Sequence, residues 1–461
     1  MDPITLFKSI YSTIALIFSI VVVMALIGLE QTNISSDVHP ALAYVLFIVA
    51  ISWLTMIEGG QASLVGLVPV NTNLYKDSHP KAYKSTVITN AGDNLDRYLL
   101  GRQFMVVLTV FTVNMSAGPI GGAEIWGFPD WLKAILFEFG LAMILITCMI
   151  GQLNSQVNAS LCMLDYIDNY FSLFTLWVAM AIEFSGLLHA SYLIQILVGL
   201  AAGKPIESNE PARSGGAQLF FWGRILFSLT VLVFCVTVTM IALFDGKTTM
   251  WEGVPPVVAL LIFAVLVCVV GMLEAMQIAF FAVAKLPKSE RGTSMFALKT
   301  CDCLFTGEGN NLPGFMIGRQ LCVVSCMFFV ARVTSVDMKG EPNLFGVSDG
   351  IQGFFNTGLL GAVMLTILGS ISWQLVASAF PIAFLSNPIT YVLLRWCLFL
   401  EATGICQGAW VLAAVHKKIA GFQRDEVYIG TAEERRKQEM GDSEAPVGPG
   451  HMTKPAFSDD E

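Results

Sequence analysis

Long apolar runs alternate with short polar connections along most of this chain. Lipid offers a polypeptide backbone no hydrogen-bond partner, so a run of about 20 apolar residues crosses a bilayer as a helix. We therefore predict an all-α integral membrane protein with about ten transmembrane helices, five in each half. The candidate runs lie near residues 10–29, 41–60, 103–116, 131–151, 172–202, 219–244, 255–284, 319–334, 351–371 and 389–415.

Composition supports the membrane assignment. Hydrophobic residues make up 55% of the chain and charged residues only 13%, against about 25% charged residues in an ordinary soluble domain. Mean hydropathy is +0.67. The net charge of −9 comes largely from a polar C-terminal tail and says little about the substrate. No phosphate loop of the G-x-x-x-x-G-K-[ST] type and no T-V-G-Y-G filter is present, which argues against direct ATP drive and a potassium channel.

Two short peptides occur twice at almost the same spacing. Glu58-Gly59-Gly60-Gln61 precedes Gly101-Arg102-Gln103, and Glu274-Ala275-Met276-Gln277 precedes Gly318-Arg319-Gln320. Further pairs at an offset of 218 extend the match: Gln156 with Gln374, Glu183 with Glu401, and Gly186 with Gly404. The chain is therefore an internal duplication.

Five spans per copy would make the second copy enter the membrane from the opposite face. We therefore expect two inverted-topology repeats, an arrangement that secondary transporters use to bind substrate near the midplane. The expected units are a first repeat over 1–202, an extracellular linker over 203–218, a second repeat over 219–418 and a disordered cytoplasmic tail over 419–461.

Basic residues in short loops indicate the cytoplasmic side. The 30–40 loop carries none, whereas the 62–102 connection and the start of the tail carry several, so we expect both termini to be cytoplasmic. One observation conflicts with inversion: the 285–319 connection is equally basic, yet inversion places it outside.

The duplicated polar groups predict a binding site. Glu58 and Gln61 are three residues apart and share a helix face, as do Glu274 and Gln277, and Arg102, Gln103, Arg319 and Gln320 add donors and acceptors. Such a pocket suits a small neutral molecule with several hydroxyls, and a carboxylate can also ligate sodium. Glycines at positions 59, 101 and 318 permit close backbone approach. Weaker candidates are Asn94, Asn311, Glu183 and Glu401.

An architectural role for the same residues is the main alternative, in which the pairs lock helices together or the arginines reach helix ends. The five His residues are scattered and most of the ten Cys residues lie in or beside apolar runs. We therefore predict no enzyme, no catalytic residues, no metal site and no cofactor. The expected partners are a small solute, sodium and the bilayer, with no nucleic acid.

The two E-x-x-Q and G-R-Q pairs, together with Cys162-Met163-Leu164-Asp165, resemble the signature motifs of the diatom silicon transporters. The resemblance covers roughly residues 1–418. It implies sodium-coupled uptake of orthosilicic acid across the plasma membrane by alternating access, for biosilicification, with the duplicated motifs near the substrate path. Silicic acid is small, neutral near pH 7 and surrounded by four hydroxyls, as the predicted pocket requires.

Two features depart from the family pattern. Ala275 stands where the first copy has Gly59, and the tail lacks the long coiled coil of many members. Other functions remain open at this point: a sodium- or proton-coupled carrier of another small neutral polar solute, or a passive pore.

Overall fold

The computed structural model describes residues 3–35, 38–203, 214–251, 253–284, 291–305, 311–338, 342–431 and 435. These residues form helices, as predicted. The first copy comprises α1 (Pro3–Gly28), α2 (Pro40–Leu67), η1 (Thr72–Tyr75), α3 (Pro80–Thr89), α4 (Asn94–Ala117), α5 (Asp130–Lys133), η2 (Ala134–Glu138), α6 (Leu141–Ile146), η3 (Thr147–Leu153), α7 (Asn154–Leu161), α8 (Met163–Ile167), α9 (Tyr170–Phe184) and α10 (Ala190–Ala202).

The same order of helices recurs in the second half. The second copy comprises α11 (Gly215–Phe244), α12 (Pro256–Ala284), α13 (Met295–Phe305), α14 (Leu312–Thr334), η5 (Leu344–Gly346), α15 (Asp349–Asn356), α16 (Leu359–Met364), η6 (Leu365–Ile371), α17 (Ser372–Ala379), α18 (Pro381–Leu385), α19 (Pro388–Ala402) and α20 (Gly408–Ala420). A short helix, α21 (Glu426–Ile429), follows. Even the π-helical segments η3 and η6 stand at equivalent positions.

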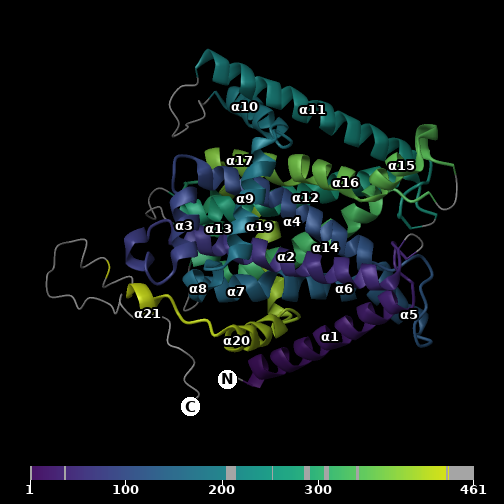
Figure 1. The fold of residues 1–461 in the computed structure, drawn as a ribbon, viewed down its shortest axis with the longest axis horizontal. Coiled ribbons are helices and arrows are strands. Elements are labelled where there is room, and N and C mark those ends of the chain that lie inside the picture. The colour runs from purple at the N-terminus through teal and green to yellow at the C-terminus, as the bar shows by residue number, and fades with distance from the viewer. Residues whose placement is uncertain are drawn as a thin grey trace.

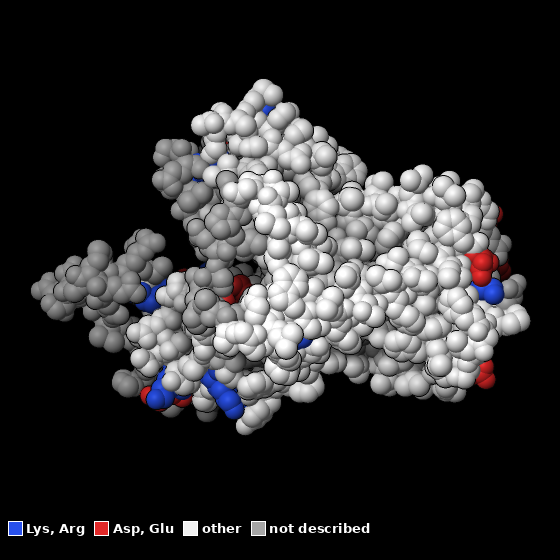
Figure 2. Space-filling model, turned by 90° about the horizontal axis from the view of Figure 1, so that it is seen from above, with Lys and Arg blue, Asp and Glu red and all other residues white. Residues whose placement is uncertain are grey.

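Helices α4 and α14 form the centre of the bundle, and α1 and α11 lie on opposite outer sides (Figure 1). Most residues of α4 and α14 are buried, whereas α1 and α11 expose many large apolar side chains. Charged side chains gather at the two ends of the molecule, with an almost uncharged band between them (Figure 2). A bilayer fits that band, because exposed apolar surface of this extent is unfavourable in water.

The number of spans differs from the prediction. Among the described residues, seven helices are long and apolar enough to cross a membrane, and α5 to α7, bent by 45°, make an eighth. The expected spans at 172–202 and 389–415 are each two shorter helices. They break at Gly186 and Gly404, which adopt φ of 84° and 72°, a left-handed conformation that stops a helix and costs glycine little.

The two copies run in the same direction, which corrects the expected inversion. One cavity of about 870 Å³, the shared cavity, is lined by the C-terminal end of α4 and by the residue that follows α14. It is also lined by the connections that follow α1 and α11. Inverted copies would place these equivalent ends on opposite faces. With four spans per copy instead of five, no inversion is required. The lining residues are Glu30, Thr32, Asn33, Ile34, Ser35, Val38, Asn114, Met115, Ile120, Thr249, Ser335, Val336, Asp337, Met338, Asn343, Asp349, Gln352, Gly353, Asn356 and Thr357.

The last helix of each copy packs against the other copy. Helix α10 contacts α11 and α17, and α20 contacts α1 and α7; Figure 1 shows α10 beside α11 and α20 beside α1. The Ser228 hydroxyl accepts a bond from the Ala190 backbone N–H at 3.0 Å, and the Ser12 hydroxyl accepts one from the Gly408 N–H at 2.8 Å. The copies are therefore intertwined.

The predicted boundaries of the linker and tail need adjustment. Residues 204–213 of the linker lie outside the described residues, and α11 begins at Gly215. The tail was predicted to be disordered from residue 419, but residues 419–431 are ordered against the bundle, as described below. Residues 432–434 and 436–461 lie outside the described part of the chain.

Candidate functional site

Glu58 of the first copy lies at the centre of a buried polar cluster. It sits on α2 and is only 3% exposed. Its Oε2 lies 2.7 Å from Nη2 of Arg102 on α4 and accepts a hydrogen bond from Nε2 of Gln156 on α7 at 2.9 Å. Its Oε1 accepts a longer bond from Gln152 at 3.4 Å. The carboxylate charge is therefore balanced by one guanidinium and solvated by two amides, as a buried charge requires.

Arg102 also organises its neighbour Gln103. Nη1 of Arg102 donates to Oε1 of Gln103 at 2.8 Å, so the amide nitrogen of Gln103 is directed away from the ion pair. That nitrogen has no hydrogen bond within the described residues. This amide nitrogen is therefore available to donate a hydrogen bond to a solute beside the neutralised Glu58–Arg102 pair.

The second copy repeats this geometry with one difference. Gln374 donates to Oε2 of Glu274 at 2.9 Å, and Nη2 of Arg319 donates to Gln320 at 2.8 Å. Nη1 of Arg319 lies 3.2 Å from Glu274, but its geometry is too poor for a hydrogen bond, so the pair is a looser charge contact. The equivalent of Gln152 is Ser370, so Glu274 has one amide donor where Glu58 has two.

Gln61 and Gln277 stand one helical turn beyond the two glutamates. Both are partly exposed, and neither side chain has a hydrogen-bond partner among the residues that the structure describes. A primary amide offers two donors and one acceptor carbonyl. These two side chains are consequently able to bind a solute without first breaking a contact within the protein.

The glycines of the motifs serve close packing. A Cβ added at Gly101 would lie 1.8 Å from the backbone oxygen of Ala179 on α9, and one at Gly318 would lie 1.8 Å from that of Cys397 on α19. A Cβ at Gly59 would meet the Tyr166 ring at 2.2 Å. These residues bring helices close against the clusters.

The weaker candidates occupy structural positions. The amide of Asn94 donates to the Ile88 carbonyl at 2.9 Å, and that of Asn311 donates to the Cys303 carbonyl at 2.7 Å, which fixes the turn before each central helix. Glu183 lies 3.6 Å from His189 in a buried pair. Glu401, on α19, is half-buried near Gly314.

The residues predicted to form one pocket lie in two clusters, one per copy. Within the described residues, no ion pair or hydrogen bond joins the two clusters. The two arginines belong to α4 and α14, which pack against each other. Gln152, Gln156 and Gln374 complete the clusters. The matched offset of Gln156 and Gln374 is the sequence signal for two of them.

The motif over residues 162–165 holds the segment that follows α20, residues 421–431, here called the C-terminal strap. The two carboxylate oxygens of Asp425 accept bonds from the backbone N–H groups of Met163 and Leu164, both at 2.9 Å. Asp165 accepts a bond from the Gln423 backbone at 2.7 Å and lies 3.2 Å from Nε2 of His79. The motif is therefore a docking site for the strap.

The strap also reaches the first cluster through aromatic packing. The Phe422 ring lies 5.7 Å from that of Tyr166, whose ring fills the space beside Gly59. Burial raises the pKa of Asp425 to about 6; the two backbone N–H bonds and His79 lower it, and the charge of Asp165 raises it further.

Comparison with known protein families assigns the chain to one of them. A family model described as Silicon transporter matches residues 1–458. The chain belongs to the silicon transporter family. No curated protein and no solved structure matches the chain. The family assignment agrees with the resemblance of the motifs and with the apolar helices of a multi-pass membrane protein. In this silicon transporter, the two Glu–Arg–Gln clusters are the leading candidates for the transport site.

Proposed function

We propose that this silicon transporter takes up orthosilicic acid across the plasma membrane by sodium-coupled alternating access. The observation that carries the proposal is the pair of equivalent Glu–Arg–Gln clusters, buried in the uncharged band of the bundle. Polar and ionisable groups at that depth are costly, so they mark a transport path more often than not.

The charge balance of each cluster favours a neutral solute. Arg102 neutralises Glu58, and Arg319 neutralises Glu274, so neither cluster carries a net charge with which to attract an anion or a cation strongly. What remains available is the set of amides: Gln61, Gln103 and their counterparts. Amides donate and accept hydrogen bonds, as each hydroxyl of silicic acid does.

Sodium coupling is compatible with the same groups. A carboxylate offers about four lone-pair sites, and the contacts above use three of those of Glu58. A hard cation that prefers oxygen ligands can therefore be added on the carboxylate side of the cluster while Arg102 stays in place. If sodium and the solute bind to the same hydrogen-bonded cluster, transport of one is coupled to transport of the other.

The proposed topology has eight spans, four per copy, with both copies in the same orientation. Parallel repeats are also found in secondary transporters. Helices α9 and α10 are about 22 and 20 Å long at 1.5 Å per residue, too short to cross singly, and they enter and leave on the same side, as do α19 and α20. This arrangement removes the earlier conflict, because both basic connections, 62–102 and 285–319, then lie on the cytoplasmic side.

In this topology the two termini and the 203–218 linker are cytoplasmic, and the shared cavity faces outward. Cysteines introduced at Gln31 and Lys247 test it, because parallel copies place both at the outer face, whereas inverted copies place them on opposite faces. A membrane-impermeant thiol reagent should label both in intact cells. Labelling of only one of the two cysteines would contradict parallel copies and support inverted ones.

The functional test is silicic acid uptake into liposomes that contain the purified protein, with an inward sodium gradient or with potassium in its place. Accumulation that requires the sodium gradient supports coupled transport. Accumulation driven by a proton gradient indicates a proton-coupled carrier, and equilibration without accumulation indicates a passive pore. No flux above that of empty liposomes, with folded protein verified, would overturn the proposal.

Gln61→Ala and Gln277→Ala test the site itself. Loss of one or two hydrogen bonds to the solute should lower uptake about five- to thirtyfold without loss of folded protein. Ser63→Ala is the control on the same helix: Ser63 is buried on the side of α2 that faces away from Gln61. Its hydroxyl has no hydrogen-bond partner among the described residues, so this variant should transport normally. Normal uptake in both Gln variants would remove these side chains from the solute path.

A further inference from the structure

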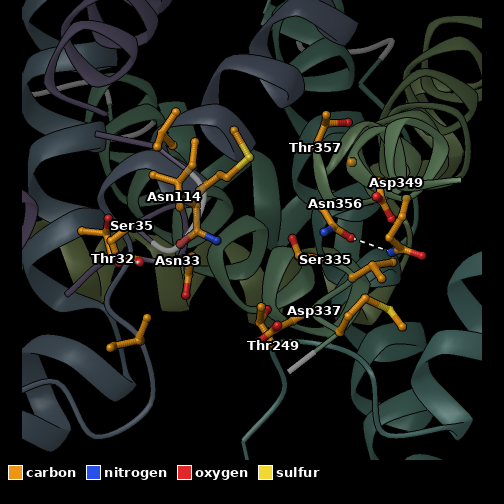
Figure 3. A pocket seen from close by; sticks show the side chains of 18 of the residues that line it. Thr32, Asn33, Ser35, Asn114, Thr249, Ser335, Asp337, Asp349, Asn356 and Thr357 are labelled. Carbon is orange, nitrogen blue, oxygen red and sulfur yellow. Dashed lines mark hydrogen bonds between the residues drawn. The ribbon is translucent and has the colours of Figure 1, made fainter. Parts of the chain in front are cut away.

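The shared cavity has a lining suited to a ligand, and none of the sequence motifs contributes to it. Residues of the first copy, such as Asn33 and Asn114, face residues of the second copy, such as Ser335 and Asn356, across it (Figure 3). The volume of about 870 Å³ is many times the roughly 30 Å³ that one water molecule occupies in the liquid. A small solute therefore enters this space with its hydration shell.

The chemistry of the lining selects by charge. Hydroxyls, carboxamides and the carboxylates Glu30, Asp337 and Asp349 line the cavity, and none of its described lining residues is Lys or Arg. Carboxylates repel phosphate, sulfate and other anions but accept hydrogen bonds from neutral hydroxyl groups. The cavity therefore favours a neutral molecule rich in hydroxyls over an anion of similar size.

Asn114 presents to the cavity an amide that has no partner within the described protein. It is 6% exposed, it lines the cavity at the end of α4 (Figure 3), and its carboxamide has no hydrogen bond to any described residue. A solute in the cavity can exchange hydrogen bonds with this amide without breaking a contact within the protein. The equivalent position in the second copy is Ala331, so the duplicated architecture does not require an amide there.

Helix α4 connects this amide to the first cluster. Gln103 and Asn114 are 11 residues apart, about three turns, and therefore share one face of the helix. Between them on that face lie the buried side chains of Val107 and Val110. The two polar positions are thus about 16 Å apart, and an apolar segment separates them. This segment hinders the passage of water and ions, and it is short enough that a movement of the helices can open a path through it.

We infer that the shared cavity is a separate binding site for a small neutral polyhydroxylated solute, with Asn114 as its principal ligand, from which the solute passes along α4 to the Glu58 cluster. The inference rests on the proposed function for the identity of the solute. It adds a second site, built from both copies, that no sequence motif indicates.

Initial rates of silicic acid uptake by cells that express the protein test the inference, because all molecules there have one orientation. Asn114→Leu keeps the size of the side chain and removes its hydrogen bonds, so KM should rise about threefold to tenfold. The maximal rate should stay within about twofold, since a loss of ground-state binding raises KM alone. Ser116→Ala is the matched control: Ser116 bonds only to its own helix, and its KM should be unchanged.

The outcomes separate the two proposals. Absence of flux in the unmodified protein overturns the proposed function. Normal flux together with an unchanged KM in Asn114→Leu overturns the cavity site, as does a lower maximal rate at constant KM. If Asn114→Leu does not fold, Asn33→Leu on the partly exposed wall takes its place with the same expectation. Phosphate should not compete in any variant, and competition by phosphate would contradict the charge selection.

Discussion

The ion pair between Glu58 and Arg102 should couple strongly in a double-mutant cycle. The two side chains are 3% and 6% exposed and their charged atoms are 2.7 Å apart. Replacement of Arg102 by Met leaves the carboxylate buried without its cation, which costs about 3–5 kcal/mol of unfolding free energy. Glu58→Gln leaves the guanidinium in the same situation. The double variant removes both charges and should cost at least about 2 kcal/mol less than the sum of the single changes.

The second copy offers an internal comparison. Arg319→Met leaves Glu274 with one amide donor, Gln374, whereas Arg102→Met leaves Glu58 with Gln156 and Gln152. A hydrogen bond to a charged group contributes about 1.5–3 kcal/mol, and the Gln152 bond is long at 3.4 Å. We therefore expect Arg319→Met to be the more destabilising change, by about 1 kcal/mol.

The assay is reversible unfolding in mixed detergent micelles, followed by tryptophan fluorescence, with silicic acid uptake measured on the same preparations. Additivity of the two single changes to within about 0.5 kcal/mol would refute the reasoning, because it would mean that the two charges do not sense each other. A larger loss in the first copy than in the second would refute the role assigned to Gln152.

Two further predictions concern packing and protonation. Gly101→Ala and Gly318→Ala each force a methyl group against a backbone oxygen and should destabilise the protein by about 3 kcal/mol or more, whereas Gly121→Ala, with open space around it, should be neutral in the same unfolding assay. The pKa of Asp425 in the docked strap is about 6, above its ordinary value of 3.8. The docked strap therefore binds more protons than the released strap, and docking should weaken as pH rises from about 4 to 6. A spin label on Val427→Cys should become more mobile over that interval, and Asp425→Asn should abolish the change.

The candidate site was largely predictable because its members recur. Spacing and repetition identified Glu58, Arg102 and their equivalents, and the structure pairs each glutamate with the arginine of its own copy. The pattern does not show the third helix of each cluster. The amides of Gln156 and Gln374 come from segments about 100 residues away from the glutamates, and only the packing of α7 against α2 and of α17 against α12 brings them close.

The fold was predictable in class but not in topology. Hydropathy counts apolar residues and does not detect a turn within them, so Gly186 and Gly404 were included in single long spans. Counting ten spans then imposed inversion, against the evidence of the two basic connections. The strap was missed for a different reason: its polar residues are those of a disordered tail, and the carboxylates of Asp165 and Asp425 find their backbone partners only after α20 has packed against α7.

The exchange of α10 and α20 between the copies bears on how such a chain arises. A half-length ancestor of α1 to α10 alone would leave α10 without the surface on which it packs, so its stable form would be a homodimer with exchanged C-terminal hairpins. Gene duplication and fusion of that dimer gives the present order of helices without any change of packing. Residues 1–213 and 214–461, produced together as separate chains, should accordingly assemble into a transporter, while neither chain alone should form a stable monomer.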